Sequence, residues 1–158
     1  MNNENKDNNA IRAEICADNN QAAECGKDKR PKSAEELTAA LAQFTGTVEY
    51  HRYWLGIALQ TDGVKYLADK ARCYWLLDAI GSYQSELAKH KDQRLQEMQF
   101  WTLRVNTDKS AVLTCVADYG EPPVITQDIE WTDFPLPEIQ IWIGGEDKTK
   151  IALLPSEY

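Results

Sequence analysis

The sequence has little of what would identify a metal centre, a cofactor site or a membrane anchor. It contains two histidines and four cysteines, no two cysteines form a CxxC pair, and no glycine-rich phosphate loop is present. No apolar run approaches the roughly 20 residues that a membrane helix needs, and no basic segment leads into an apolar one as in a secretory signal. We therefore expect a cytoplasmic protein with no metal, no cofactor and no membrane contact.

Aromatic residues are missing from the start of the chain, since all 15 of them lie at Phe44 or later. Seven of the eight asparagines, by contrast, fall within the first 20 residues. A segment with so little apolar surface cannot offset the conformational entropy that it loses on ordering. The sequence therefore predicts a disordered polar tail over residues 1–32 and a single α+β domain over residues 33–158.

Positive charge is also scarce, and its distribution is uneven. The chain carries 17 Lys and Arg against 25 Asp and Glu, a formal net charge of -8. Residues 116–158 contain nine acids and two bases, whereas residues 36–115 contain nine of each. The overall charge opposes tight binding to nucleic-acid phosphates. The acidic last part of the chain either contacts a basic partner or is a solvated face.

Helical periodicity occupies the first half of the predicted domain. Ser33 and Glu36 have the spacing of a capping box, and the apolar pattern that follows them stops at Gly46. Thr61 or Asp62 is expected to cap a second helix. Together the patterns predict helices over residues 34–45, 62–71 and 73–91.

Past residue 98 the apolar period changes to two, which is typical of strands with one buried face. Five strands are predicted, over residues 99–105, 111–118, 124–132, 138–143 and 149–154. Alternation places Trp101 and Trp131 in the core and Trp142 on the outward side. Residues 47–59 fit either a strand broken at Gly56 or a short helix. The expected fold is α+β, with N-terminal helices packed on one face of an antiparallel meander of about five strands.

The outward face of this sheet is the main candidate site. Asp128, Glu130 and Glu138 fall on one predicted face of neighbouring strands, where they could bind a divalent cation, contact a basic partner or meet only water. Trp142 shares the outward side, and could anchor a partner or be covered by a cross-strand neighbour. These four residues form the predicted partner-binding site.

Three other side chains are candidates for catalysis, and each has a structural explanation as well. His51 could act as a general base beside Arg52, or be a surface histidine among packing aromatics. Asp62 could be a catalytic carboxylate, but helix capping explains it fully. Asp78 could have a perturbed pKa beside Trp75, or hydrogen-bond a loop at the edge of the core. Because no nucleophile motif accompanies them, we assign no catalytic residue.

The helical half of the chain carries most of the bases, which leaves nucleic-acid binding as a further hypothesis. The residues concerned are Arg52, Lys65, Lys70, Arg72, Lys89, Lys91 and Arg94. They would have to share one surface to hold a phosphate backbone.

Six short blocks of the sequence carry a resemblance to a known family. They are Phe44-Thr45-Gly46, Thr61-Asp62-Gly63-Val64, Tyr74-Trp75-Leu76-Leu77-Asp78, Phe100-Trp101-Thr102-Leu103, Thr132-Asp133-Phe134-Pro135-Leu136 and Leu154-Pro155-Ser156-Glu157-Tyr158. In these blocks the chain resembles the DUF6876 type, a bacterial family of unknown function found in cyanobacteria, Bacteroidetes and mobile genetic elements. The resemblance spans roughly residues 36–158, implies an accessory function, and assigns a role to no residue.

These observations favour a non-enzymatic protein-binding accessory domain. An example would be an anti-defence inhibitor, carried by a mobile element, that presents an acidic surface to a basic protein. The alternatives are an enzyme of undescribed type that uses His51, Asp62 and Asp78, and a nucleic-acid-binding accessory protein that uses the basic helical region.

Overall fold

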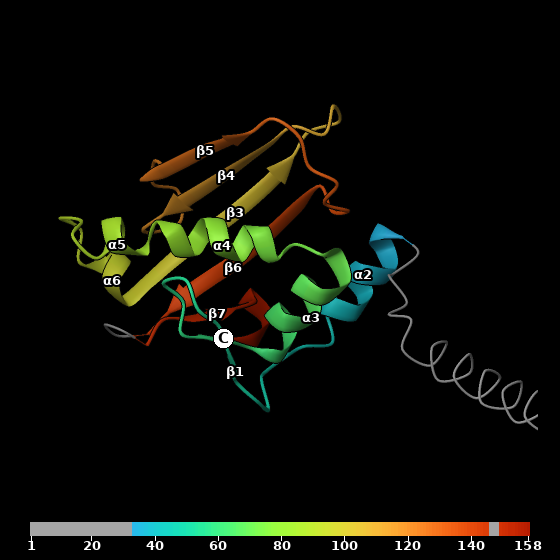
Figure 1. Ribbon diagram of the computed structural model, residues 1–158, viewed down its shortest axis with the longest axis horizontal. Coiled ribbons are helices and arrows are strands. Elements are labelled where there is room, and N and C mark those ends of the chain that lie inside the picture. The colour runs from blue at the N-terminus through green and yellow to red at the C-terminus, as the bar shows by residue number, and fades with distance from the viewer. Residues whose placement is uncertain (1–32, 146–148) are drawn as a thin grey trace, which may run out of the picture.

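The protein folds into a sheet with helices over one face and toward the ends of the sheet, so the predicted packing of all N-terminal helices on one face differs in detail (Figure 1). The computed structural model describes residues 33–145 and 149–158, so the predicted tail lies outside the described residues. The helices are α2 (Ala34–Leu41), α3 (Asp62–Ala71), α4 (Tyr74–Ser82), α5 (Gln84–Leu87), α6 (Arg94–Glu97) and the 3-10 helix η1 (Pro155–Glu157). The strands are β1 (His51–Arg52), β2 (Leu59–Gln60), β3 (Met98–Val105), β4 (Ala111–Val116), β5 (Ile125–Ile129), β6 (Glu138–Gly144) and β7 (Ile151–Leu153). The predicted α+β class is confirmed.

The helices begin where the sequence places their caps. Ser33 accepts a hydrogen bond from the Glu36 amide at 3.2 Å, and the Thr61 hydroxyl accepts one from the Val64 amide at 3.5 Å. The helix expected over residues 73–91 is instead two helices, α4 and α5, separated at Tyr83. In Figure 1, α3 and α4 lie over one face of the sheet, and α2 lies beside α3.

The sheet has seven strands rather than five, in the order β1-β2-β7-β6-β3-β4-β5. The five predicted strands correspond to β3 through β7, and the short β1 and β2 extend one edge. Every neighbouring pair is antiparallel except β2 and β7, which are parallel. Strands β3, β4 and β5 form a meander, but β6 lies beside β3 and not beside β5. The predicted meander is therefore wrong, and the order β6-β3-β4-β5 is that of a Greek key.

The Greek key requires a crossing connection, which residues 130–137 provide. The Thr132 amide donates a hydrogen bond to the Lys109 carbonyl, 2.8 Å away in the turn between β3 and β4. The side chains of Phe134 and Leu136 are buried in the core. The Thr-Asp-Phe-Pro-Leu block thus fastens the crossing over the ends of β3 and β4.

The prediction that Trp131 lies in the core is wrong, and the start of this crossing explains why. Strand β5 ends at Ile129, three residues before the predicted end, because the chain leaves the ladder to cross the sheet. The alternation of buried and exposed side chains therefore no longer predicts whether Trp131 is buried. Trp131, predicted to be in the core, is 67% exposed, whereas Trp101, in the middle of β3, is 1% exposed as predicted.

Of the two predictions for residues 47–59, a broken strand or a short helix, the structure shows the strand, since β1 and β2 form a short hairpin. The Tyr53 amide donates to the Ala58 carbonyl at 2.9 Å, and Gly56 turns the chain with a φ of +71°. The hairpin tip packs directly on α4: a Cβ built on Gly81 would lie 1.8 Å from the Leu55 carbonyl oxygen. The helix can approach the hairpin this closely only because residue 81 has no side chain.

The core lies between the helices and the covered face of the sheet. Two buried amides within it satisfy each other, because Gln84 and Gln99 donate reciprocally at 2.9 and 3.0 Å. The Trp101 indole N–H donates to the same Gln99 side chain at 3.0 Å. Among the described residues, none of the helices is both long enough and apolar enough to cross a bilayer.

Candidate functional site

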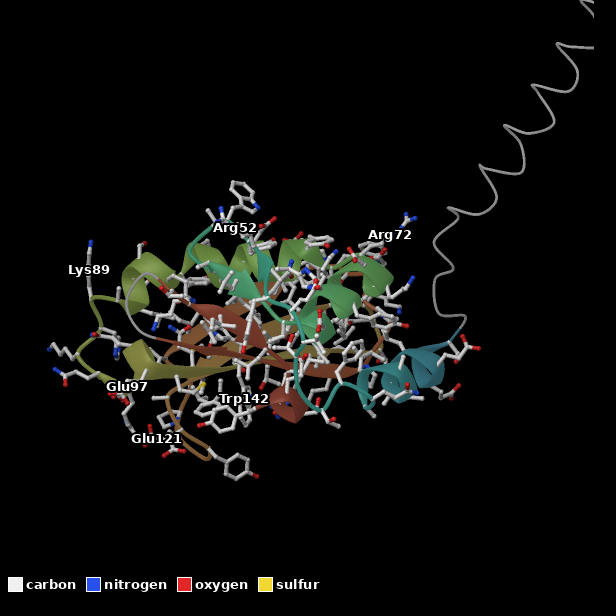
Figure 2. All side chains as sticks on the ribbon, turned by 90° about the horizontal axis from the view of Figure 1, so that it is seen from below. Arg52, Arg72, Lys89, Glu97, Glu121 and Trp142 are labelled. Carbon is white, nitrogen blue, oxygen red and sulfur yellow. The ribbon has the colours of Figure 1, made fainter. Side chains whose placement is uncertain are left out.

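The face of the sheet opposite the helices is the largest feature that packing does not explain. We call it the open face, and it comprises Phe100, Thr102, Arg104, Val112, Thr114, Val116, Thr126, Asp128, Glu138, Gln140 and Trp142. None of these side chains is buried. Figure 2 shows Trp142 on the side of the sheet away from the helices.

The strand register divides the open face into three rows that cross β6, β3, β4 and β5. An apolar row contains Trp142, Phe100 and Val116. A neutral polar row contains Gln140, Thr102, Thr114 and Thr126. The last row carries the charges and contains Glu138, Arg104, Val112 and Asp128. The face is therefore graded from apolar to charged along the strands.

Aromatic rings cluster at the apolar end of the open face. The Trp142 ring lies 5.0 Å from that of Phe100 and 5.5 Å from that of the terminal Tyr158, with edge-to-face geometry in both pairs. Trp142 is thus partly covered by its neighbours and partly exposed. A cavity of about 470 Å³ opens beside it, and Tyr119 and Pro123, from the connection between β4 and β5, form its wall.

The charges around the open face are only partly neutralised. Arg104 binds Glu138 at 2.7 Å, within the charged row. Beyond the other end of the face, Arg94 binds Glu121 at 3.0 Å and has Asp118 at 3.7 Å. Asp128 and Glu130, in contrast, form no ion pair with any described residue.

The structure places the four predicted binding residues as follows. Asp128, Glu138 and Trp142 share the open face, while Glu130 lies beyond the end of β5. The two strands concerned are not neighbours as predicted, because β3 and β4 separate them. With strands about 4.8 Å apart, Asp128 and Glu138 lie roughly 14 Å from each other, too far for one cation. They mark opposite edges of one face.

Sequence reasoning missed two residues of this site. Phe100 sits in the middle of the aromatic cluster, and its signal was an aromatic side chain at an outward position of an alternating strand. Tyr119 is 99% exposed at the wall of the cavity. It follows the end of β4 in a turn, so no periodicity points to it.

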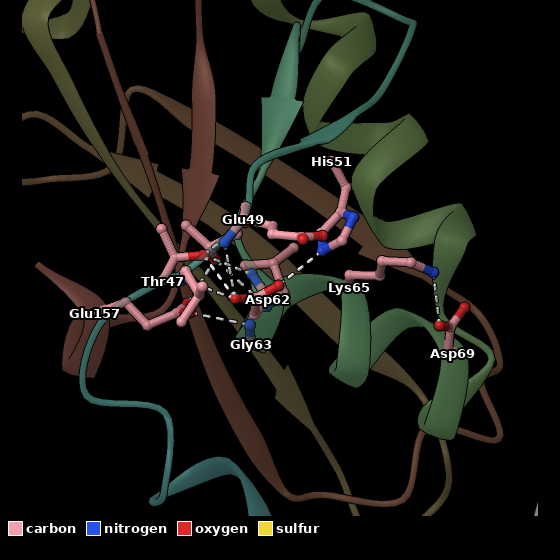
Figure 3. A network of polar contacts seen from close by, with 11 residues as sticks. Thr47, Glu49, His51, Asp62, Gly63, Lys65, Asp69 and Glu157 are labelled. Atoms are coloured by element: carbon pink, nitrogen blue, oxygen red, sulfur yellow. Dashed lines mark hydrogen bonds and ion pairs between the residues drawn. The ribbon is translucent and has the colours of Figure 1, made fainter.

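His51 and Asp62, two of the candidate catalytic residues, do meet (Figure 3). His51 Nε2 lies 2.7 Å from Asp62 Oδ1. The other carboxylate oxygen accepts from the Val48 amide at 2.9 Å, from the Glu49 amide at 3.2 Å and from the Thr47 hydroxyl at 3.2 Å. The bond from His51, followed by those from the two amides, holds the pKa of Asp62 well below its usual range. With both oxygens engaged, Asp62 fastens the segment before β1 to the start of α3.

A second carboxylate binds the same helix start from the far end of the chain. Glu157 accepts from the Gly63 amide at 2.9 Å and from the Leu154 amide at 3.1 Å, and the Thr61 hydroxyl donates to it as well. A carboxylate there neutralises unpaired N–H groups and complements the helix dipole. The Pro-Ser-Glu-Tyr block therefore contributes a cap to α3.

Asp78, the third catalytic candidate, forms no contact with the other two. Its carboxylate accepts a hydrogen bond from the Tyr53 hydroxyl at 2.7 Å, and the Tyr53 ring stacks on Tyr74 with centroids 6.3 Å apart. Burial, followed by the bond to Asp78, raises the pKa of Tyr53 well above its usual value. Asp78 thus holds the β1–β2 hairpin against α4, at the edge of the core.

The basic residues of the helical half do not form one surface. Lys65 binds Asp69 at 2.9 Å, and Arg94 is engaged by the acids described above. Figure 2 shows Arg52, Arg72 and Lys89 spread over the length of the protein rather than gathered. A nucleic-acid backbone would find no continuous basic track along these residues.

Nothing in the described residues forms a metal or thiol centre. No group of three or more His, Cys, Asp or Glu side chains there could hold a metal ion. Cys73 and Cys115 are buried, and burial raises the pKa of both thiols to about 12. Thiols so rarely ionised are poor nucleophiles.

Comparison with known proteins gives one result. Residues 35–158 match the model of a family of unknown function, DUF6876, and the chain belongs to that family. No curated protein and no solved structure matches the chain. The match includes the whole open face and the residues that fasten α3.

Proposed function

We propose that this member of the DUF6876 family is a non-enzymatic binding domain that holds a basic protein partner against the open face of its sheet. The observation that supports this proposal best is the aromatic cluster around Trp142, partly exposed at the apolar end of the open face and next to a cavity of about 470 Å³. Large aromatic side chains in such pockets supply much of the binding energy of protein interfaces.

The acids of the open face supply the preference for a basic partner. Asp128 and Glu130 form no ion pair with a described residue, and Asp118 is only loosely held by Arg94 at 3.7 Å. Unpaired acids at the rim of an interface raise the association rate of a basic partner and disfavour an acidic one. The aromatic cluster would then provide affinity, and the acids would provide selection.

The biological setting follows from the family resemblance and is also a proposal. An accessory protein of a bacterial mobile element that presents an acidic surface could inhibit a defence protein whose basic surface normally holds nucleic acid. The open face fits such a role because Asp128 and Glu138 lie at opposite edges of its charged row, while the rows beside it are neutral and apolar. A catalytic role has less support, because His51, Asp62 and Asp78 are explained by the contacts that they make within the fold.

The test is capture of a partner from the source bacterium by wild-type protein and by a matched pair of tryptophan variants. Trp142→Ala removes the largest side chain of the apolar row, while Trp54→Ala removes a 71% exposed tryptophan in the β1–β2 hairpin, which packs on α4. We expect a partner with an excess of Lys and Arg, bound equally by wild type and Trp54→Ala. Its Kd should be about 30-fold or more weaker with Trp142→Ala.

Salt and charge reversal test the electrostatic part of the proposal. Raising the salt from about 0.1 M to about 1 M shortens the screening length from about 10 Å to about 3 Å, so the association rate should fall. Asp128→Lys with Glu130→Lys should weaken binding, whereas Glu86→Lys on α5 should not. Retention of no protein at low salt, or of the same proteins by Trp142→Ala and wild type, would refute the proposal.

A further inference from the structure

Strand β6 has an edge that lacks a neighbouring strand over half its length. On one side, β3 pairs with β6 from Glu138 to Gly144. On the other side, β7 pairs only with residues 142–144. The backbone of β6 before Trp142 is therefore an uncovered strand edge within an otherwise complete sheet.

The direction of the backbone groups follows from the hydrogen-bond pattern. In an antiparallel pair, alternate residues direct both their N–H and C=O toward the partner strand, and the residues between them direct both groups away. The Val105 amide donates to the Pro137 carbonyl at 2.8 Å, so residue 137 faces β3, as do 139 and 141. Glu138 and Gln140 therefore direct their N–H and C=O outward. Within residues 33–145 and 149–158, no hydrogen bond takes up these four groups.

A groove lies along this edge. It has a volume of about 380 Å³, and α2 lines it on one side and η1 on the other, through Leu41 and Ala42 and through Pro155 and Ser156. The edge of β6 lies between these two elements, and a single extended segment beside it would sit at the usual strand spacing of about 4.8 Å.

From this geometry we infer that the partner of the open face binds by adding an extended segment to the edge of β6, as a strand beside Glu138 and Gln140. The inference deepens the proposed function and rests on it. The four free backbone groups would complete a ladder, which is the basis of recognition by strand addition. The new strand would continue the line of β7 past its end at Leu153.

The groove also predicts the side chains of that segment. The residue opposite Ile139 would point to the helical side of the sheet, where Leu41, Leu136 and Leu154 line the groove. An aliphatic side chain fits there. The residues before and after it would point to the open face beside Glu138 and Gln140, where the proposed basic side chains of the partner would meet the acids.

The experiment uses the full chain and linear 12-residue peptides selected from a random library displayed on phage. Ala42→Arg fills the groove, and Ala39→Arg places the same side chain at an exposed position of α2 that does not line it. We expect selected peptides to bind wild type and Ala39→Arg equally, and Ala42→Arg at least about tenfold more weakly. Gln140→Pro should have a similar effect, because it removes an outward N–H without breaking the ladder with β3.

Amide exchange identifies the occupant. Peptide binding should slow the exchange of the Glu138 and Gln140 amides, which have no acceptor among the described residues. Slow exchange of both amides in the free full-length chain would mean that residues 1–32 fill the edge, and would overturn the assignment to a partner. Equal binding of the peptides by Ala42→Arg and wild type, or enrichment of no peptide, would overturn strand addition. If Trp142→Ala and salt weaken binding of the captured basic partner while Ala42→Arg does not, the proposed function stands without this inference.

Discussion

The close contact between α4 and the β1–β2 hairpin predicts that a normally stabilising substitution will destabilise this protein. A Cβ on Gly81 would lie 1.8 Å from the Leu55 carbonyl oxygen and 3.0 Å from its carbonyl carbon. These are backbone atoms, which cannot rotate away as the end of a side chain can. Gly81→Ala must therefore push the hairpin off the helix, or shift the helix itself.

Two effects of opposite sign determine how much Gly81→Ala changes the free energy of unfolding. Alanine in place of glycine within a helix ordinarily stabilises by about 1 kcal/mol. Overpacking of a rigid contact costs about 1–3 kcal/mol, occasionally more. Because the overlap here is with backbone, we expect the steric cost to win and Gly81→Ala to lower the free energy of unfolding by about 2 kcal/mol. For a chain of this size, the Tm should fall by roughly 4–8 °C.

Gly46→Ala is the matched control, because a Cβ at Gly46 would have no atom within 4 Å. It should leave the stability unchanged or raise it by up to about 1 kcal/mol. Urea unfolding followed by tryptophan fluorescence measures both variants, and Tyr53→Phe reports on the hairpin. If Gly81→Ala displaces the hairpin, removing the Tyr53–Asp78 bond should cost less in that background than in wild type. Equal stability of Gly81→Ala and wild type would refute the reasoning.

Two further predictions concern groups with displaced pKa values. The pKa of Asp62 is lowered in the folded protein, so its contribution to stability is fully present above the unfolded value of about 4 and is lost as the pH falls below it. The difference in urea midpoint between wild type and Asp62→Asn should therefore be larger at pH 6 than at pH 2 to 3. A difference independent of pH would contradict the bonding described. Burial raises the pKa of Cys73 and Cys115 to about 12, so in a chain carrying Cys16→Ser and Cys25→Ser the native protein at pH 8 should react only slowly with a disulfide reagent, and unfolding in urea should release both thiols. Rapid reaction of the native protein would show that the core opens readily at these sites.

Local patterns in the sequence predict the helix starts and the strand faces well. Ser33 and Thr61 cap helices because a side-chain oxygen can bond an amide three residues ahead, an interaction contained in a four-residue window. Trp101 is buried because alternation holds throughout β3. The five longer strands follow from the same period of two, since one buried face is enough to impose it.

The order of the strands lies outside such patterns. Alternation assigns each side chain to a face but says nothing about which strand lies beside it, so β6 could equally well have followed β5 in the sheet. The choice depends on the crossing at residues 130–137, where Phe134 and Leu136 enter a core that the earlier strands have formed. Trp131 was assigned to the core for the same reason, because its neighbours suggest a continuing strand while the crossing ends it.

Part of the candidate site could likewise be predicted from local patterns, and part could not. The outward position of Trp142 was predictable, because it depends only on the parity of β6. The bonds of Asp62 to Val48 and of Glu157 to Gly63 were not, since they join residues 14 and 94 positions apart. These bonds nevertheless explain two of the carboxylates in the family blocks: Asp62 fastens a loop, and Glu157 the last residues of the chain, to the start of α3.

The two sides of the molecule differ in how fully their carboxylates and aromatic rings are engaged by contacts within the fold. On the helical side, Asp62 has both carboxylate oxygens and Asp78 has one oxygen bound by other parts of the chain, so contacts within the fold explain them. On the open face, the contacts within the fold leave part of the Trp142 ring exposed and leave Asp128 without an ion pair among the described residues. If the open face only had to meet water, threonines like those of its neutral polar row could also occupy the apolar row. The apolar row would gain further free energy if apolar groups of a partner covered it, and that is the reason to look for the partner there.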